Sequence, residues 1–202
     1  MNKIIVGFIG ASGSGKDTAS DYLVNNYGFK KMSFADPLKK MVKECFLLSD
    51  NQCYGSEKEE VDERWGCSPR EMFQVIGTEF GQYMLPELLP SLKDKIAPKC
   101  FWVSLLLEHI KKVDTRCIVI ADVRFKHEID ALLNEGAYLF RIERNVDKQT
   151  RDHISEQEWK IIDHDKIFPI NNNGTLQDLY NKIDNYFLLF SVEFFIHFNM
   201  IN

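Results

Sequence analysis

The chain has 202 residues, of which 45% are hydrophobic and 27% are charged, a composition typical of a globular α/β protein with room for an insertion or lid. A net charge of −5 and a pI of about 5.6 exclude the basic surface that grips polynucleotide phosphates, so no direct nucleic-acid partner is expected. The five cysteines contain no C-x-x-C pair, which argues against a zinc site or a disulfide framework and favours a reducing, cytoplasmic compartment.

Strand-like and helix-like segments alternate along the chain, which predicts a mostly parallel sheet with helices on both faces. We expect strands at residues 3–9, 29–34, 116–121, 137–143 and 166–170. We expect helices at residues 16–26, 36–48, 68–77, 79–89, 100–112, 124–135 and 175–190. The chain opens directly into the first strand, so no signal peptide is expected.

Residues 4–18, IIVGFIGASGSGKDT, contain the motif that is most informative about function. An apolar strand, a glycine-rich loop and a helix follow one another, and G-x-x-x-x-G-K spans Gly10 to Lys16. Glycines allow successive backbone N–H groups to turn inward and bind phosphate oxygens, and Lys16 adds a positive charge for the terminal phosphates. This spacing in this context predicts a phosphate-binding P-loop; the alternative is a plain Gly/Ser connector.

The residue after the P-loop lysine is Asp17, where a Ser or Thr is usual, and Thr18 follows it. The usual hydroxyl binds the Mg²⁺ that accompanies the nucleotide, and a carboxylate can also hold Mg²⁺ directly or through water. Asp17 and Thr18 are therefore candidate metal ligands. Asp17 is equally explained as a first-turn acid that the helix dipole favours, and the two roles are compatible.

A second motif is CIVIADVR at residues 117–124, where an apolar strand ends in an acid and a helix follows. In P-loop phosphotransferases an acid at this place holds the Mg²⁺ water shell. Ligands of open α/β sheets bind at the carboxyl ends of strands, so Asp122 and Arg124 are expected to face the same crevice as Lys16. The alternative for Asp122 is a helix N-cap.

The helix predicted at residues 68–77 begins with a capping box, Ser68 and Glu71, and should end at Gly77. It places Arg70 and Gln74 on one face, where the Arg70 guanidinium suits a phosphate or a planar group; the alternative is a solvent-facing side chain. The acidic run at residues 57–63 is expected to be a solvated face.

Residues 144–165 are polar and charged, and a closing lid of a phosphotransferase fits there. Arginines that a lid delivers can neutralise the transferred phosphoryl group, which makes Arg141, Arg144 and Arg151 candidates; plain surface charge is the alternative. Residues 186–202 form an apolar tail too short and too polar to span a membrane. The tail is expected to pack on the body or to associate with a second copy in a homodimer, and a peripheral membrane anchor is the alternative.

Taken together, these motifs resemble those of the deoxynucleoside monophosphate kinases of bacteriophages and large DNA viruses. The resemblance runs nearly end to end and rests on these segments: G-x-x-G-S-G-K-D-T at 10–18, FADPLKK at 34–40, REMFQVIGTEFG at 70–81, FWV at 101–103, DVRFKHE at 122–128, HISE at 153–156 and INNNGTL at 170–176. The segments GT after the Arg/Gln helix and D-V-R-F-x-x-E are the most specific.

The resemblance implies a kinase that moves the ATP γ-phosphate onto a deoxynucleoside 5′-monophosphate. The implied fold is a P-loop three-layer α/β sandwich in one domain, with an acceptor-binding insertion at about residues 36–100 and a lid at about 144–165. ATP and Mg²⁺ would be held by the loop, by the start of the helix and by a residue near the adenine: Gly10, Ser12, Gly13, Ser14, Gly15, Lys16, Asp17, Thr18 and Asn172.

On the acceptor side the resemblance implies a larger set of residues: Lys39, Arg70, Gln74, Thr78, Trp102, Asp122, Arg124 and Glu128. It implies five catalytic residues: Lys16, Asp122, Arg124, Arg144 and Arg151. The implied ligands of the metal ion are Asp17, Thr18 and Asp122.

Two other functions remain open at this point. One is a small-molecule kinase of the phosphomevalonate type, since the G-K-D loop, Arg64-Trp65-Gly66 and the D-x-R segment resemble that enzyme too. The other is a nucleotide-binding assembly protein without turnover.

Overall fold

The computed structural model describes residues 3–145, 162 and 164–189, and the chain folds into two units. The first unit is built from residues 1–31 and 115–202, and the second from residues 32–114. The predicted P-loop belongs to the first unit. Arg151, most of the predicted lid and the apolar tail beyond Leu189 lie outside the described residues.

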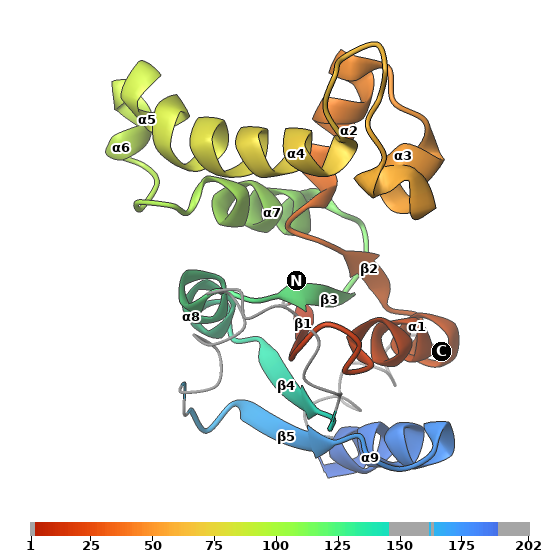
Figure 1. Cartoon of the computed structure of the whole chain (residues 1–202). Helices are drawn as coiled ribbons and strands as arrows, with labels where there is room; N and C mark the ends of the chain where they lie inside the picture. The colour runs from red at the N-terminus through yellow and green to blue at the C-terminus, as the bar shows by residue number, and fades with distance from the viewer. Residues whose placement is uncertain (1–2, 146–161, 163, 190–202) are drawn as a thin grey trace. The chain divides into compact units, whose positions relative to one another are not determined.

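The first unit is organised around a five-stranded sheet in the order β2-β3-β1-β4-β5 (Figure 1). The strands are β1 Ile4–Ile9, β2 Lys30–Met32, β3 Cys117–Val123, β4 Tyr138–Glu143 and β5 Ile167–Asn171. β1 pairs in parallel with β3 and with β4, and β4 pairs in parallel with β5. The five predicted strands and the α/β class are confirmed.

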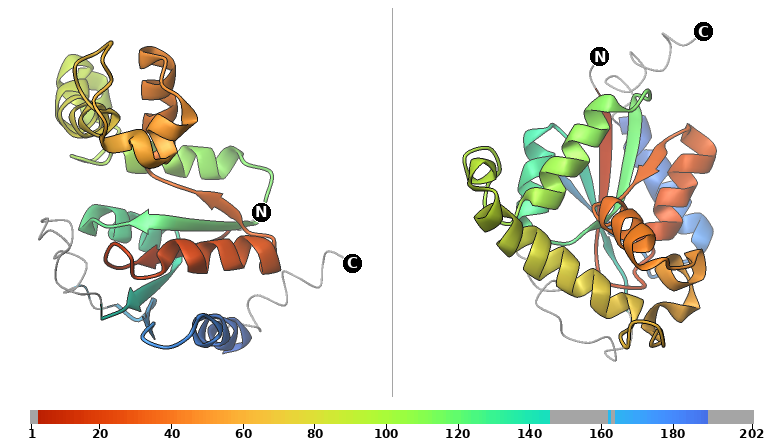
Figure 2. Two further views of the ribbon diagram at one scale, coloured as in Figure 1. Left: turned by 45° about the vertical axis from the view of Figure 1, so that its right-hand side comes forward. Right: turned by 90° about the horizontal axis from the view of Figure 1, so that it is seen from above.

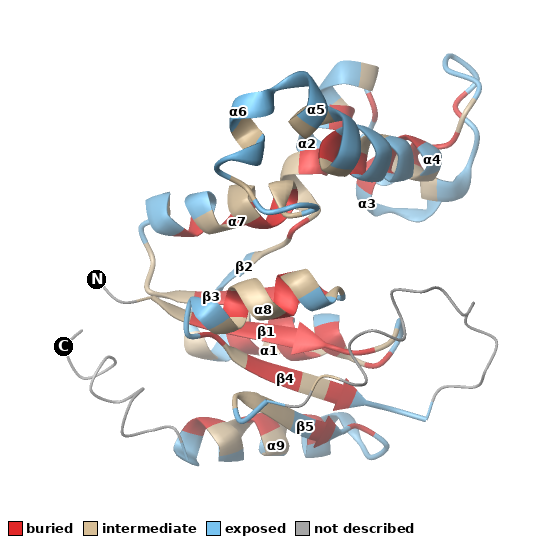
Figure 3. Ribbon diagram, turned by 90° about the vertical axis from the view of Figure 1, so that its left-hand side faces the viewer, coloured by how far each residue is buried: buried red, intermediate tan, exposed pale blue. Residues whose placement is uncertain are grey.

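Helices cover both faces of this sheet, as the alternating pattern predicts (Figures 1 and 2). α1 (Lys16–Tyr27) and α9 (Leu176–Leu189) pack on the face that carries Val6 and Phe8. α8 (Lys126–Asn134) covers the opposite face, where the Leu132 side chain lies close to Gly7. Figure 3 shows β1 and β3 mostly buried and β4 buried in part, so the centre of the sheet gives the loops at its end a rigid base.

The second unit is helical. Its elements are α2 Asp36–Phe46, α3 Asp50–Tyr54, the 3₁₀ helix η1 Ser56–Glu59, α4 Pro69–Gln74, the π-helix η2 Val75–Met84, α5 Leu85–Leu88, α6 Pro90–Lys93 and α7 Phe101–Lys112. A separate apolar core holds them together: Leu38, Val42, Leu48, Cys53, Met72, Phe73 and Trp102. The predicted capping box is confirmed, since Ser68 and Glu71 bond reciprocally at the start of α4.

Gly77 does not end a helix, contrary to our expectation. The helical path continues from α4 through η2 into α5, and both Gly77 and Gly81 are buried within it. A Cβ on Gly77 would lie 2.7 Å from the Leu38 side chain, and one on Gly81 would lie 2.7 Å from the Trp102 ring. These glycines therefore allow close packing rather than a stop, and wide π-turns of this kind occur often at functional sites.

The acidic run is only partly a solvated face. The carboxylate of Asp62 is buried, and it accepts hydrogen bonds from the Arg64 side chain and from Gln52 Nε2. The bonds from Arg64 hold the pKa of Asp62 well below its ordinary value. The segment around Asp62 is thus fixed to the unit by a buried charge, which a count of acidic residues does not reveal.

Three further features bear on the class of protein. No helix in the described part of the chain is long and apolar enough to cross a membrane. Residues 3–145, 162 and 164–189 contain no cluster of three or more His, Cys, Asp or Glu side chains that would hold a metal ion by themselves. All five cysteines lie within those residues, and none of them forms a disulfide.

Candidate active site

The glycine-rich loop has the backbone geometry that anion binding requires. Gly10, Gly13 and Gly15 all have positive φ angles, of 151°, 74° and 107°. A Cβ on Gly10 would lie 2.5 Å from the carbonyl oxygen of Ile142, so only glycine fits there. α1 begins immediately after the loop, and its N-cap is Gly15, which has no side chain to cap the first turn, so the N–H groups of that turn are placed to bind an anion.

Lys16 is buried within the loop that it follows. Its ammonium donates to the carbonyl oxygens of Gly10 at 2.7 Å and of Ala11 at 2.6 Å, and the residue is only 9% exposed. The positive charge is therefore held at the mouth of the loop by backbone dipoles. A bound phosphate would be in a position to take over the ammonium from these two carbonyls.

Ser14 is the most enclosed polar residue of the loop, with 1% of its surface exposed. Its hydroxyl has no hydrogen-bond partner among the described residues, while its backbone N–H donates to the Ala11 carbonyl at 3.2 Å. The Ser14 carbonyl accepts a hydrogen bond from Asn172 Nδ2 at 2.8 Å. The loop is thus tied to the segment that follows β5.

Asp17 lies in the first turn of α1, and its side chain is 83% exposed. It pairs with Lys31 at 3.1 Å, and Lys31 also pairs with Asp21 at 2.9 Å. The place of Asp17 at the helix start agrees with the dipole explanation. Thr18 is half-buried and borders a shallow cavity of about 550 Å³ between α1 and α9. A metal-binding role for either residue stays a prediction.

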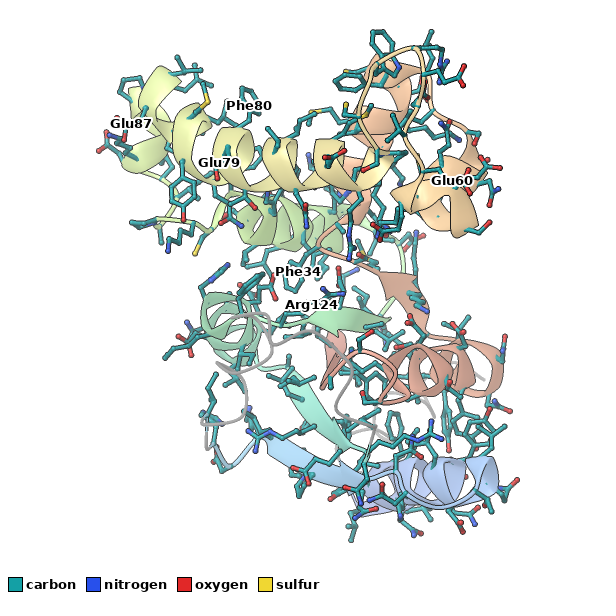
Figure 4. The ribbon with its side chains drawn as sticks, viewed as in Figure 1. Phe34, Glu60, Glu79, Phe80, Glu87 and Arg124 are labelled. Carbon is teal, nitrogen blue, oxygen red and sulfur yellow. The ribbon has the colours of Figure 1, made fainter. Side chains whose placement is uncertain are left out.

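Asp122 and Arg124 lie at the carboxyl end of β3, beside the end of β1. The register pairs Ile9 with Val123, so the two strands finish together where the P-loop begins. Asp122 is half-buried inside β3, which extends to Val123; the N-cap of α8 is Phe125. The N-cap explanation for Asp122 is therefore wrong. Arg124 is exposed and projects where β3 leads into α8 (Figure 4).

Glu128 holds the turn that carries Arg124. Its Oε2 accepts from the backbone N–H of Arg124 at 2.7 Å and of Phe125 at 3.0 Å, and the residue is 7% exposed. Burial raises the pKa of this carboxyl to about 8, although the two N–H groups act in the opposite direction. Its bonds fix the backbone of the turn, so Glu128 orients Arg124 in addition to any role at the acceptor.

This raised pKa predicts a pH-dependent contribution to stability. Between pH 4.5 and about 8 the unfolded chain ionises Glu128 while the folded chain keeps its proton, so the contribution of this residue to the free energy of unfolding falls as the pH rises. Glu128→Gln keeps an acceptor for both N–H groups and has no proton to lose. We expect its melting temperature, relative to wild type, to rise from pH 5 to pH 8, with Glu135→Gln as an exposed control on the same segment. A difference that does not vary with pH would contradict the assignment.

The arginines near the predicted lid are only partly described. Arg141 on β4 donates from its guanidinium to the Ile162 carbonyl, and its Nε is buried without a partner among the described residues. Arg144 follows β4 and is exposed. A lid role for Arg144 and Arg151 stays a prediction.

In the second unit, the predicted acceptor residues lie on α2, α4, η2 and α7. Arg70 is in the first turn of α4, where it pairs with Glu59 of η1 at 3.2 Å. The Lys39 ammonium lies over the Tyr54 ring, 4.7 Å from its centroid. Gln74 and Thr78 are exposed, as are Glu79 and Phe80, which project from η2 in Figure 4.

Trp102 is buried and supports η2. Its indole N–H donates to the Gly77 carbonyl at 2.7 Å, and the ring lies against Gly81. This bond ties the side chain of Trp102, on α7, to the backbone of η2. Contact of Trp102 with an acceptor stays a prediction, whereas its role in holding η2 is evident in the structure.

Comparison with known proteins identifies the family. A family model for deoxynucleotide monophosphate kinase matches residues 47–183. A protein of Acanthamoeba polyphaga mimivirus that is provisionally named a deoxynucleotide monophosphate kinase is 41% identical over 185 residues, which cover 89% of this chain and 94% of that protein. The chain belongs to the deoxynucleotide monophosphate kinase family.

A phage member of the family matches at lower identity. The deoxynucleotide monophosphate kinase of Enterobacteria phage T4 is 29% identical over 128 residues, which cover 62% of this chain and 46% of the phage protein. Among solved structures, TT1252 from Thermus thermophilus matches 93% of this chain and 98% of its own with 16% identity and a TM-score of 0.47. The resemblance inferred from the sequence motifs is confirmed, and the phosphomevalonate-kinase alternative is not favoured.

Proposed function

We propose that this protein transfers the γ-phosphate of ATP to a deoxynucleoside 5′-monophosphate and releases ADP and a deoxynucleoside diphosphate. The observation that carries the proposal is the buried Lys16 ammonium inside a glycine loop of the required geometry, in a chain of this family. Phosphoryl transfer needs little covalent chemistry from the protein, which must position two anions and neutralise the charge on the transferred group.

On the donor side, the loop amides and Lys16 would bind the phosphates of ATP. When bound, Mg²⁺ would offset part of the negative charge of the phosphates. The donors available for it fit a hard cation, because Asp122 and Asp17 offer carboxylate oxygens and Thr18 offers a hydroxyl. Of these, the Asp122 carboxylate is at the strand end next to the loop, and Asp17 would have to leave Lys31 to take part.

On the acceptor side, we assign the 5′-phosphate to cationic groups and the base to polar side chains of the second unit. Within the second unit, Arg70 offers a guanidinium fork in the first turn of α4. Within the first unit, Arg124 offers a guanidinium fork at the end of β3. Gln74 and Thr78 are exposed and offer hydrogen-bonding groups to a base or sugar. Lys39 would add a further positive charge.

The proposal is tested by a coupled ADP-release assay with ATP and Mg²⁺. The acceptors are dGMP, dTMP, dCMP and dAMP, the matching ribonucleotides, and phosphomevalonate. We expect turnover with at least one deoxynucleotide, and the pattern across the panel identifies the base and the sugar preference. Turnover with phosphomevalonate alone would contradict the proposal. ATP binding without turnover of any acceptor would instead favour a nucleotide-binding assembly protein.

A further inference from the structure

Asn172 occupies a place that the family resemblance did not predict. We expected its side chain to meet the adenine, yet Nδ2 donates to the Ser14 carbonyl at 2.8 Å, and the residue is 8% exposed. The two residues are 158 positions apart in the sequence. Its backbone N–H donates to the Glu143 carbonyl at 2.7 Å, which fixes Asn172 to the end of the sheet.

We propose that Asn172 is a positioning residue that sets the orientation of the Ser14–Gly15 peptide and thereby aims a P-loop amide at the phosphates of the nucleotide. This inference rests on the proposed function of the loop. In a planar trans peptide the C=O and the next N–H point in opposite directions. Because Asn172 holds the Ser14 carbonyl on one side, the Gly15 N–H is directed to the other side.

The backbone conformation of Gly15 explains why the Ser14–Gly15 peptide needs a restraint from outside the loop. Its φ is 107°, and glycine adopts this and other backbone conformations at similar energy. The peptide before Gly15 can therefore rotate at little cost. A Cβ at Gly15 would lie only 2.5 Å from Asn172 Nδ2. The amide of Asn172 therefore fills the space that a side chain at position 15 would need, and it restrains a peptide that glycine alone leaves free to rotate.

The test compares two anions that share phosphates but not a base. Binding of ATP and of inorganic tripolyphosphate is measured by calorimetry for wild type, Asn172→Ala and Asn172→Asp. We expect Asn172→Ala to weaken both ligands by about tenfold, the effect of losing one well-made hydrogen bond. Asn172→Asp keeps the shape but loses the N–H donor, and we expect at least the same loss. Asn173→Ala is the matched control, because Asn173 is exposed and bonds to Asn145 instead of the loop.

The outcomes separate the possible roles. Equal weakening of both ligands, in a variant that is still folded at the assay temperature and binds the acceptor as wild type does, supports positioning of the loop. Weakening of ATP alone would show that Asn172 reads the adenine and would overturn the inference, as would unchanged binding of both. If wild type binds both anions but phosphorylates no deoxynucleotide, the proposed function fails while this comparison still decides the role of Asn172.

Discussion

Replacing Lys16 by alanine should lower kcat/KM by about a thousandfold or more, with ATP as donor and the preferred deoxynucleotide as acceptor. The ammonium is the charge that the loop itself holds at its mouth, where the terminal phosphates are expected. Its loss removes stabilisation of the charge that is spread over the transferred phosphoryl oxygens. Initial rates in the ADP-release assay measure this effect.

Folding should survive the change. The substitution costs two hydrogen bonds to backbone carbonyls, each worth roughly 1 kcal/mol, which is a small part of the roughly 5–15 kcal/mol by which a folded domain is stable. Lys16→Met keeps the apolar stem and should be equally inactive. Lys30→Ala removes the same charge from the exposed surface of β2 and should leave the rate unchanged. A Lys16→Ala protein with near-normal turnover would refute the P-loop assignment.

Replacing Arg124 by alanine should raise KM for the acceptor, lower kcat and reduce kcat/KM by about a hundredfold. Arg124 follows the strand end next to the P-loop, and Glu128 fixes its backbone there. Arg124→Lys keeps the charge but loses the bidentate fork, so it should recover only part of the activity.

A matched control distinguishes this effect from a general loss of charge. Lys126 lies two residues further along, is exposed and pairs with Asp130, so Lys126→Ala makes the same charge change in the same segment. We expect it to have near-normal kinetics. If Arg124→Ala also left the acceptor KM and kcat unchanged, the Arg124 side chain would have no part in acceptor binding or transfer.

Features encoded by neighbouring residues could be predicted from the sequence. The strand, loop and helix around Lys16 follow from local spacing, and so does the capping box at Ser68, because each is settled within a few residues. The order of strands and helices likewise follows from alternating apolar patterns.

Features that depend on distant partners could not be predicted. The sequence predicts that a helix ends at Gly77. In the structure the helical path continues, because Leu38 packs closely on Gly77 and Trp102 packs closely on Gly81. Asp62 reads as one of several surface acids, and its burial with Arg64 and Gln52 is visible only in three dimensions. The bond from Asn172 to the P-loop has no local signal at all.

The way the second unit is connected has a consequence for the evolution of substrate choice. It is one uninterrupted stretch, residues 32–114, which leaves the first unit at the last residue of β2 and returns before β3. These two strands are neighbours in the sheet, and β2 has only three residues. A recombination event needs only two junctions to exchange the entire segment, and it would leave the P-loop, Asn172, Asp122 and Arg124 in place. Under the proposed assignment of the acceptor base to the second unit, acceptor preference can change as a module while the P-loop is inherited intact.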